Sequence, residues 1–151
     1  MTVYFFDTSA LVKRYVIEAG SSWVRSMTSP TAGNVTFIAQ ITPVEVVSAF
    51  ARRERDGSIP TRTSKALHLL LNRHVMREYE VFGLSNEVVK QAQTLLGLHI
   101  LRGFDAIQLA SALEIQIKIA AANRPPLIFV CADSRLINAA AHSGLQTYIP
   151  T

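Results

Sequence analysis

Apolar residues follow two patterns along this chain, one typical of strands and one typical of helices. Residues 2–6 and 127–131 are continuously apolar and rich in β-branched and aromatic side chains, which is typical of strands buried on both faces of a parallel sheet. Residues 35–39 and 79–84 indicate two further strands, and residues 146–149 a short edge strand. Because parallel neighbours need crossover connections, strands that alternate with helices predict an α/β domain with a mainly parallel sheet.

Apolar residues at helical spacing predict the connections between these strands. Helices are expected over residues 9–20, 21–27, 43–56, 62–76, 85–99, 105–121 and 134–143. Before residue 43, Thr42 is expected to be the N-cap, with Glu45 reaching back to it in a capping box. The helix after Asp105 is expected to bury one face, made of Ala106, Leu109, Ala110, Leu113, Ile117, Ala120 and Ala121.

Composition narrows the class of protein. A chain of 151 residues with 49% hydrophobic residues predicts one compact domain over residues 1–151. No apolar run has the length of a membrane span and no secretory leader pattern is present, so we expect a cytoplasmic protein without a membrane partner. The net charge of +4 favours polyanionic partners without identifying one. The single cysteine, Cys131, lies in an apolar strand and is expected to be a buried core residue.

Four carboxylates stand where apolar runs give way to helix starts: Asp7, Glu45, Asp105 and Asp133. Each could be a simple helix cap. However, the carboxyl ends of parallel strands share one edge of a sheet, and ligands bind there. We therefore expect the four acids to meet in one pocket, which would bring together three of the four Asp residues of the chain.

Clustered carboxylates repel each other unless a cation neutralises them. Mg²⁺ or Mn²⁺ prefers carboxylate oxygens and can activate a water molecule toward a phosphodiester. No His or Cys stands beside these acids in the sequence, which argues against zinc. The pattern thus predicts a hard divalent cation.

Four short motifs, spread in order over almost the whole chain, resemble those of one family. They are Asp7-Thr8-Ser9-Ala10-Leu11, Pro43-Val44-Glu45-Val46, Gly103-Phe104-Asp105-Ala106-Ile107-Gln108-Leu109-Ala110 and Ala132-Asp133-Ser134-Arg135-Leu136. No single motif is specific, but the ordered set is similar to that of the PIN domain, and within it to VapC-type toxin ribonucleases of type II toxin-antitoxin systems. The resemblance implies a three-layer α/β/α fold with an acidic pocket at the C-terminal ends of the strands.

The same resemblance implies an activity, that of a metal-dependent endoribonuclease in which a metal-activated water hydrolyses an RNA phosphodiester. Asp7 and Asp105 would be the principal metal ligands, Glu45 and Asp133 would complete the catalytic acids, and Ser9 would place its hydroxyl near the metal. The implied cofactor is Mg²⁺, with Mn²⁺ able to substitute. The implied partners are RNA, a cognate antitoxin and a second copy of the chain in a homodimer.

Two details of the resemblance can be compared with the residues. The family commonly has Ser or Thr two residues before the last acid, so Cys131 should weaken or remove a hydrogen bond there. The antitoxin is expected to lay an amphipathic segment into a groove, and Trp23, Val24 and Met27 could line it. They could equally belong to the core, which we favour.

Basic residues near the acidic motifs are candidates for holding RNA through its phosphates. They are Lys13, Arg14, Arg52, Arg53, Arg55 and Arg102. An alternative is that they only keep helix surfaces solvated. A haloacid-type phosphatase is disfavoured, because Ser9 stands where that class needs a second Asp. A non-catalytic RNA- or partner-binding module, with the acids as caps, remains the main alternative.

Overall fold

The computed structural model describes all residues from Met1 to Thr151 and contains one five-stranded sheet. The strands are β1 (Val3–Phe6), β2 (Val35–Ala39), β3 (Tyr79–Phe82), β4 (Ile128–Val130) and β5 (Gln146–Tyr148). The α-helices are α1 (Thr8–Leu11), α2 (Ser21–Thr28), α3 (Thr42–Arg55), α4 (Thr61–Arg77), α5 (Asn86–Leu98), α6 (Gly103–Ala121) and α7 (Ser134–His142). Two 3₁₀ helices complete the chain, η1 (Val12–Arg14) and η2 (Pro30–Ala32).

All strand pairs are parallel, in the order β3-β2-β1-β4-β5. The chain builds one half of the sheet outward from β1 and then crosses over to build the other half. The strand order therefore reverses beside β1, and the carboxyl ends of β1 and β4 lie next to each other. A crevice forms at such a point in open parallel sheets, and ligands bind in it.

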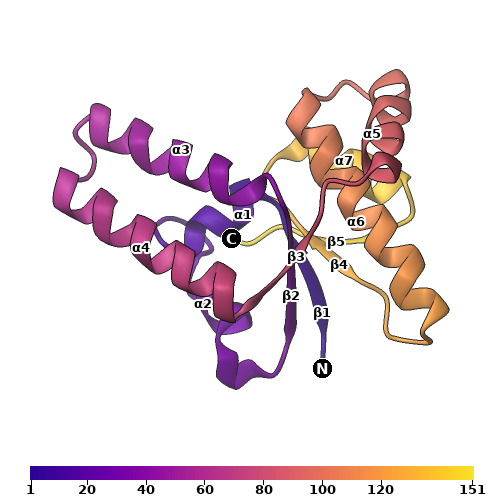
Figure 1. The fold of residues 1–151 in the computed structure, drawn as a ribbon, viewed down its shortest axis with the longest axis horizontal. Coiled ribbons are helices and arrows are strands. Elements are labelled where there is room, and N and C mark those ends of the chain that lie inside the picture. The colour runs from indigo at the N-terminus through magenta and orange to yellow at the C-terminus, as the bar shows by residue number, and fades with distance from the viewer.

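Helices cover both faces of the sheet, which gives the three-layer α/β/α arrangement (Figure 1). Successive side chains of β1 point to opposite faces. Val3 and Phe5 belong to a core with α5, α6 and α7, whereas Tyr4 and Phe6 belong to a second core with the helices from α1 to α4. The helices α3 and α4 form an antiparallel pair that projects from the sheet (Figure 1). No helix is both long enough and apolar enough to cross a membrane.

The helix expected over residues 9–20 is wrong in length. It ends at Leu11 and continues only as η1 to Arg14. Side chains then hold the chain in a turn, because Lys13 Nζ donates to the Ala19 carbonyl at 2.8 Å and Ser21 Oγ donates to the Val16 carbonyl at 3.1 Å. Gly20 follows with a φ of +89°, which ends any helical path before α2.

The buried face of α6 also differs from the expected one. Near its start, Ala106, Leu109 and Ala110 are buried as expected. Farther along, Ile115 and Ile119 are buried, whereas Ile117 is 63% exposed and Ala120 and Ala121 are exposed. Apolar side chains occur on nearly all sides of this part of the helix, so periodicity does not define which stripe faces the core. Packing against β2, α5 and α7 decides it.

The expectation that α2 contributes to the core is confirmed. Val24 is fully buried, and Trp23 and Met27 pack against the core cluster that contains Tyr4 and Phe6. These three side chains therefore do not form an open groove.

Candidate active site

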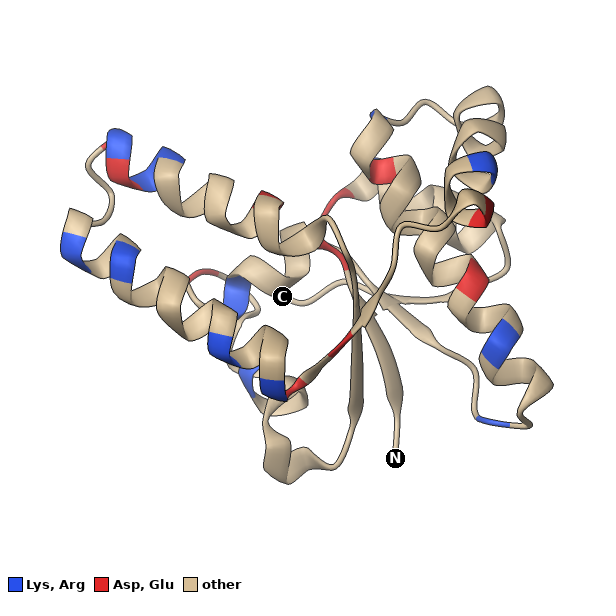
Figure 2. Ribbon diagram, viewed as in Figure 1, with Lys and Arg blue, Asp and Glu red and all other residues tan.

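The four predicted acids line one pocket of about 800 Å³. Acidic positions at the start of α3 and near the start of α6 lie around the carboxyl edge of the sheet, with basic positions along α3 and α4 (Figure 2). Asp7 follows β1, Asp133 precedes α7, Glu45 lies in the first turn of α3 and Asp105 in the first turn of α6. The strands and helices thus bring together residues from four distant parts of the sequence.

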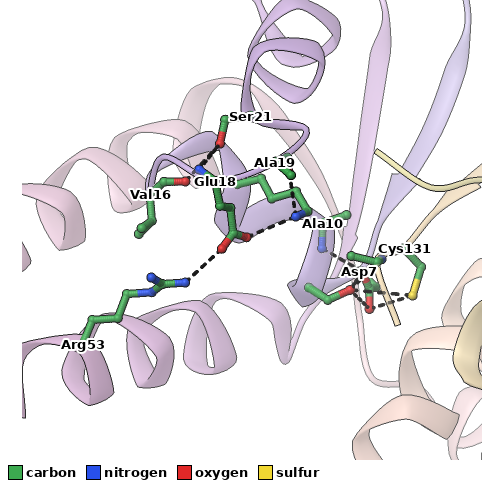
Figure 3. Close-up of polar contacts among 11 residues, drawn as sticks. Asp7, Ala10, Val16, Glu18, Ala19, Ser21, Arg53 and Cys131 are labelled. Carbon is green, nitrogen blue, oxygen red and sulfur yellow. Dashed lines mark hydrogen bonds and ion pairs between the residues drawn. The ribbon is translucent and has the colours of Figure 1, made fainter. Parts of the chain in front are cut away.

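Asp7 is the deepest of these acids, with 4% of its surface exposed. Its backbone N–H continues the β1–β4 ladder by donating to the Val130 carbonyl at 3.1 Å. Its Oδ1 accepts from Ala10 N at 3.0 Å and from Ser9 Oγ at 2.8 Å, so it caps α1 as well (Figure 3). Burial raises the pKa of Asp7 to about 6, although hydrogen bonds, that from Ser9 above all, partly oppose this shift. The ionised form of Asp7 is therefore energetically unfavourable in this buried position, and a bound cation would stabilise it.

Asp105 and Asp133 line the same pocket. Burial, and in addition the negative charge of Asp133, raises the pKa of Asp105. Asp133 is the N-cap of α7 and accepts from the backbone N–H groups of Arg135 and Leu136 through Oδ1. Asp105 Oδ2 accepts from the backbone N–H of Arg102 at 3.3 Å. Asp133 therefore has the predicted N-cap role, whereas Asp105 is not an N-cap, because it is the third residue of α6 and accepts from the backbone N–H of the N-cap, Arg102. Both acids also line the pocket.

The predicted capping box of Thr42 and Glu45 is wrong. Thr42 is the first helical residue of α3 and is fully buried, and the N-cap, Ile41, makes no side-chain capping bond. The Glu45 side chain instead turns toward the other helices around the pocket. Its Oε1 accepts from Thr8 Oγ1 at 2.8 Å and from Gln108 Nε2 at 2.9 Å. Oε1 of Glu45 is therefore hydrogen-bonded to these two side chains and not to the helix terminus.

Three of the acids share a common arrangement of their oxygens. Glu45, Asp105 and Asp133 each engage one carboxylate oxygen in hydrogen bonds, and the other has no partner within the chain. None of the four acids forms a salt bridge. Fixed carboxylates with a free oxygen and no neutralising side chain are suited to a hard divalent cation.

No point in the molecule is surrounded by three or more His, Cys, Asp or Glu side chains at metal-binding distance. The four acids therefore line one pocket without three of them converging on a single metal-binding point.

Cys131 lies closer to the acids than the sequence indicated. It is fully buried, as expected, and its Sγ lies 3.3 Å from Asp7 Oδ2. The expected loss of the family's hydroxyl contact is thus partly offset, because the thiol donates to Asp7 (Figure 3). Burial and the adjacent Asp7 raise the pKa of Cys131, so it stays a protonated donor rather than a metal-binding thiolate.

Comparison with known proteins gives a consistent result. No family model matches the sequence. A curated relative, Ribonuclease VapC47 of Mycobacterium tuberculosis, is 28% identical over 148 residues, which cover 97% of this chain and 96% of the relative. The chain has the PIN-like fold and resembles a VapC ribonuclease in sequence.

Solved structures with the same PIN-like fold are more distant in sequence. FitAcB from Neisseria gonorrhoeae superposes with a TM-score of 0.66 at 13% identity and covers 98% of both chains. VapC20 of Mycobacterium tuberculosis, described as a sarcin-ricin loop cleaving toxin, superposes with a TM-score of 0.61 at 15% identity, over 94% of this chain and 95% of that one. VapBC2 from Rickettsia felis, bound to a DNA fragment from its promoter, matches with a TM-score of 0.61 at 13% identity, over 98% of both chains.

Within this PIN-like fold, only some of the predicted RNA-binding cations line the pocket. They are Lys13, Arg52, Arg53 and Arg102. Lys13 and Arg53 are already paired with Glu18, at 3.3 Å and 3.1 Å (Figure 3). Arg52 and Arg102 are exposed, and their guanidinium groups have no hydrogen-bond or salt-bridge partner. These two arginines are the cations that a ligand can reach without breaking an existing pair.

Arg14 and Arg55 do not line the pocket. Arg14 is held elsewhere, because it donates to Tyr79 Oη at 2.7 Å and pairs with Glu78 at 2.6 Å. The resulting network also includes the buried hydroxyl of Tyr15, which lies 2.6 Å from Tyr79 Oη. Arg14 therefore joins η1 to the start of β3 and serves the fold.

The structure adds pocket residues that sequence reasoning did not select. Thr8 and Gln108 contact Glu45. Glu18 forms ion pairs with two of the cations, Lys13 and Arg53. Phe104 lines the pocket with 54% of its surface exposed. Thr8, Phe104 and Gln108 lie inside the quoted motifs, but a role for them depends on side-chain direction across three helices, which spacing along the chain does not give.

Proposed function

We propose that this protein is a Mg²⁺-dependent endoribonuclease and the toxin of a toxin-antitoxin pair, with Mn²⁺ able to replace Mg²⁺. One observation carries the proposal. Glu45, Asp105 and Asp133 line one pocket with buried Asp7, each with one oxygen fixed and one free, and no side chain neutralises them. The similarity to Ribonuclease VapC47 supports RNA as the substrate.

The acids of the pocket indicate which residues would hold the cation. Asp7 and Asp105 would be the principal ligands, since burial raises the pKa of both and a cation would relieve the cost of ionising them. When bound, Mg²⁺ would neutralise charge that develops on the phosphate and acidify a water molecule. Ser9 fixes Asp7 by donating to it, and it also accepts from Ala132 N at 2.9 Å, so one hydroxyl ties together the ends of β1 and β4.

The reaction is hydrolysis, in which a water oxygen bonds to phosphorus and one P–O ester bond of the RNA breaks. A proton from the water finishes on the departing oxygen. The chain contributes by orientation: Arg52 and Arg102, which line the same pocket as the acids, would bind the RNA backbone through its phosphates. Glu45 and Asp133, with their free oxygens, hold protons or waters at the reacting phosphate.

Phe104 favours an unpaired substrate. Its ring lies at the pocket, one residue from Asp105, and belongs to neither core cluster and to no aromatic pair. Exposed aromatic rings bind single-stranded nucleic acid by stacking on its bases. We therefore propose single-stranded or loop RNA as the substrate class.

The partner proteins are part of the same proposal. Solved structures with this fold include a toxin-antitoxin complex from Klebsiella pneumoniae. We propose a cognate antitoxin and a homodimer for this chain. Expression of the chain alone should arrest growth, co-expression of the antitoxin should relieve the arrest, and Asp105→Asn should remove the need for the antitoxin.

Incubation of the purified protein with a single-stranded RNA tests the activity. Cleavage is expected only with Mg²⁺ or Mn²⁺ and should be lost in Asp105→Asn, with Glu87→Gln, an exposed acid outside this pocket, as the control. The competing function, a non-catalytic binding module with the acids as caps, predicts no cation-dependent cleavage by the wild type. Full activity in Asp105→Asn would refute the proposed role of that acid, since Asn caps a helix about as well as Asp.

A further inference from the structure

Gln108 is a polar residue in the most apolar part of the chain. It lies in α6 directly before the buried Leu109 and has only 2% of its surface exposed. A buried amide is costly unless it is hydrogen-bonded. All the partners of this amide are polar groups from helices on the other side of the sheet edge, namely Thr8, Thr42 and Glu45. The side chain therefore links the two helical layers at the pocket.

The contacts of the Gln108 amide converge on one carboxylate. Its Nε2 lies 2.9 Å from Glu45 Oε1, 3.1 Å from Thr8 Oγ1 and 3.0 Å from Thr42 Oγ1. Thr8 Oγ1 donates to the same Glu45 Oε1 at 2.8 Å. Thr8 and Gln108, from two different helices, thus both donate to Oε1 of Glu45, and Oε2 has no partner in the chain.

We propose that Gln108 is a positioning residue of the nuclease site, which acts through Glu45. This role rests on the proposed function. With Thr8, it fixes the Glu45 side chain so that the second carboxylate oxygen stays directed at the reacting phosphate or its waters. A Glu side chain has three rotatable bonds, so without these donors it would lose its single orientation at the pocket. Groups that orient active-site ligands in this way typically change activity about 10–100-fold when removed.

A double-mutant cycle on RNA cleavage tests this role. Gln108→Leu keeps a similar volume and should lower cleavage about 10–100-fold. If Gln108 acts through Glu45, then Gln108→Leu combined with Glu45→Gln should be no slower than Glu45→Gln alone. Ser111→Ala is the matched control, because Ser111 is also buried in α6 and its hydroxyl donates only to the Ile107 carbonyl. It should cleave at the wild-type rate. Multiplication of the two single effects in the double variant would overturn the proposal.

A second measurement covers the case in which Gln108→Leu does not fold. Gln108→Glu places two carboxylates against each other and should lower the midpoint of urea unfolding. Adding Glu45→Gln restores an amide beside a carboxylate and should recover that midpoint, while cleavage stays as low as in Glu45→Gln. Failure to recover the midpoint would overturn the contact.

The outcomes separate the positioning role from the proposed function. Cation-dependent cleavage by the wild type with equal cleavage by Gln108→Leu would refute the positioning role alone. No cleavage by the wild type would refute the proposed function, and the positioning role with it.

Discussion

The buried carboxylate of Asp7 leads to a prediction that combines stability with metal binding. Burial raises its pKa from an ordinary 3.8 to about 6. Below about pH 3.8 the group is neutral in both the folded and the unfolded chain, and this neutral form is the one that the fold favours. As the pH rises through about 6, the group must ionise in its buried site, and that stability is lost. Asp7→Asn has no proton to lose at this position, so it lacks this contribution to the pH dependence of stability.

The size of the effect follows from the two pKa values. The difference between 3.8 and about 6 corresponds to about 3 kcal/mol of unfolding free energy. Without metal, the stability of Asp7→Asn relative to the wild type should therefore increase by about 3 kcal/mol between about pH 4 and about pH 7. The change with pH matters more than the absolute difference, because Asn also alters the hydrogen bonds from Ser9 and Ala10.

Urea unfolding of both proteins across this pH range measures the difference, and a second series at neutral pH adds MgCl₂. The cation should stabilise the wild type by about 2.7 kcal/mol at a concentration of 100 Kd and should have little effect on Asp7→Asn, which should also lose RNA cleavage. A stability difference that stays constant with pH would refute the raised pKa. Equal stabilisation of both proteins by Mg²⁺ would refute Asp7 as a principal ligand.

Further predictions concern the cations, the exposed ring and the core. Arg52→Gln should weaken RNA binding and lower its salt dependence by about one phosphate contact, whereas Arg14→Gln should mainly lower unfolding stability; equal losses of RNA affinity would contradict this division. Phe104→Ala should weaken binding of single-stranded RNA by about 1–3 kcal/mol in a fluorescence titration, and an unchanged affinity would exclude base stacking there. Ile115→Ala should cost about 2–5 kcal/mol in urea unfolding, against about 0.5 kcal/mol or less for the exposed Ile117→Ala; the reverse order would refute the observed face of α6.

Local chemistry determined much of the fold from the sequence alone. Continuous apolar runs predicted β1 and β4 correctly, because a strand buried on both faces needs apolar side chains at every position. The residues after those strands, Asp7 and Asp133, were predicted as pocket acids and as possible caps, and they are both. Parallel topology explains this success, since it sends the carboxyl ends of all strands to one edge.

Only the tertiary structure decided which side chains meet across elements. The cap expected of Glu45 is local, but Thr8 and Gln108 offer it donors from two other helices. Arg14 was grouped with the pocket because it follows Asp7 closely, yet Glu78 and Tyr79 hold it elsewhere. In both cases a partner more than 30 residues away competes with a local one, and spacing along the chain carries no information about that partner. The sequence by itself therefore determined the strands, the shared edge and four of the acids that line the pocket. Tertiary packing determined the direction of each side chain, and with it which oxygens and cations stay free for a ligand.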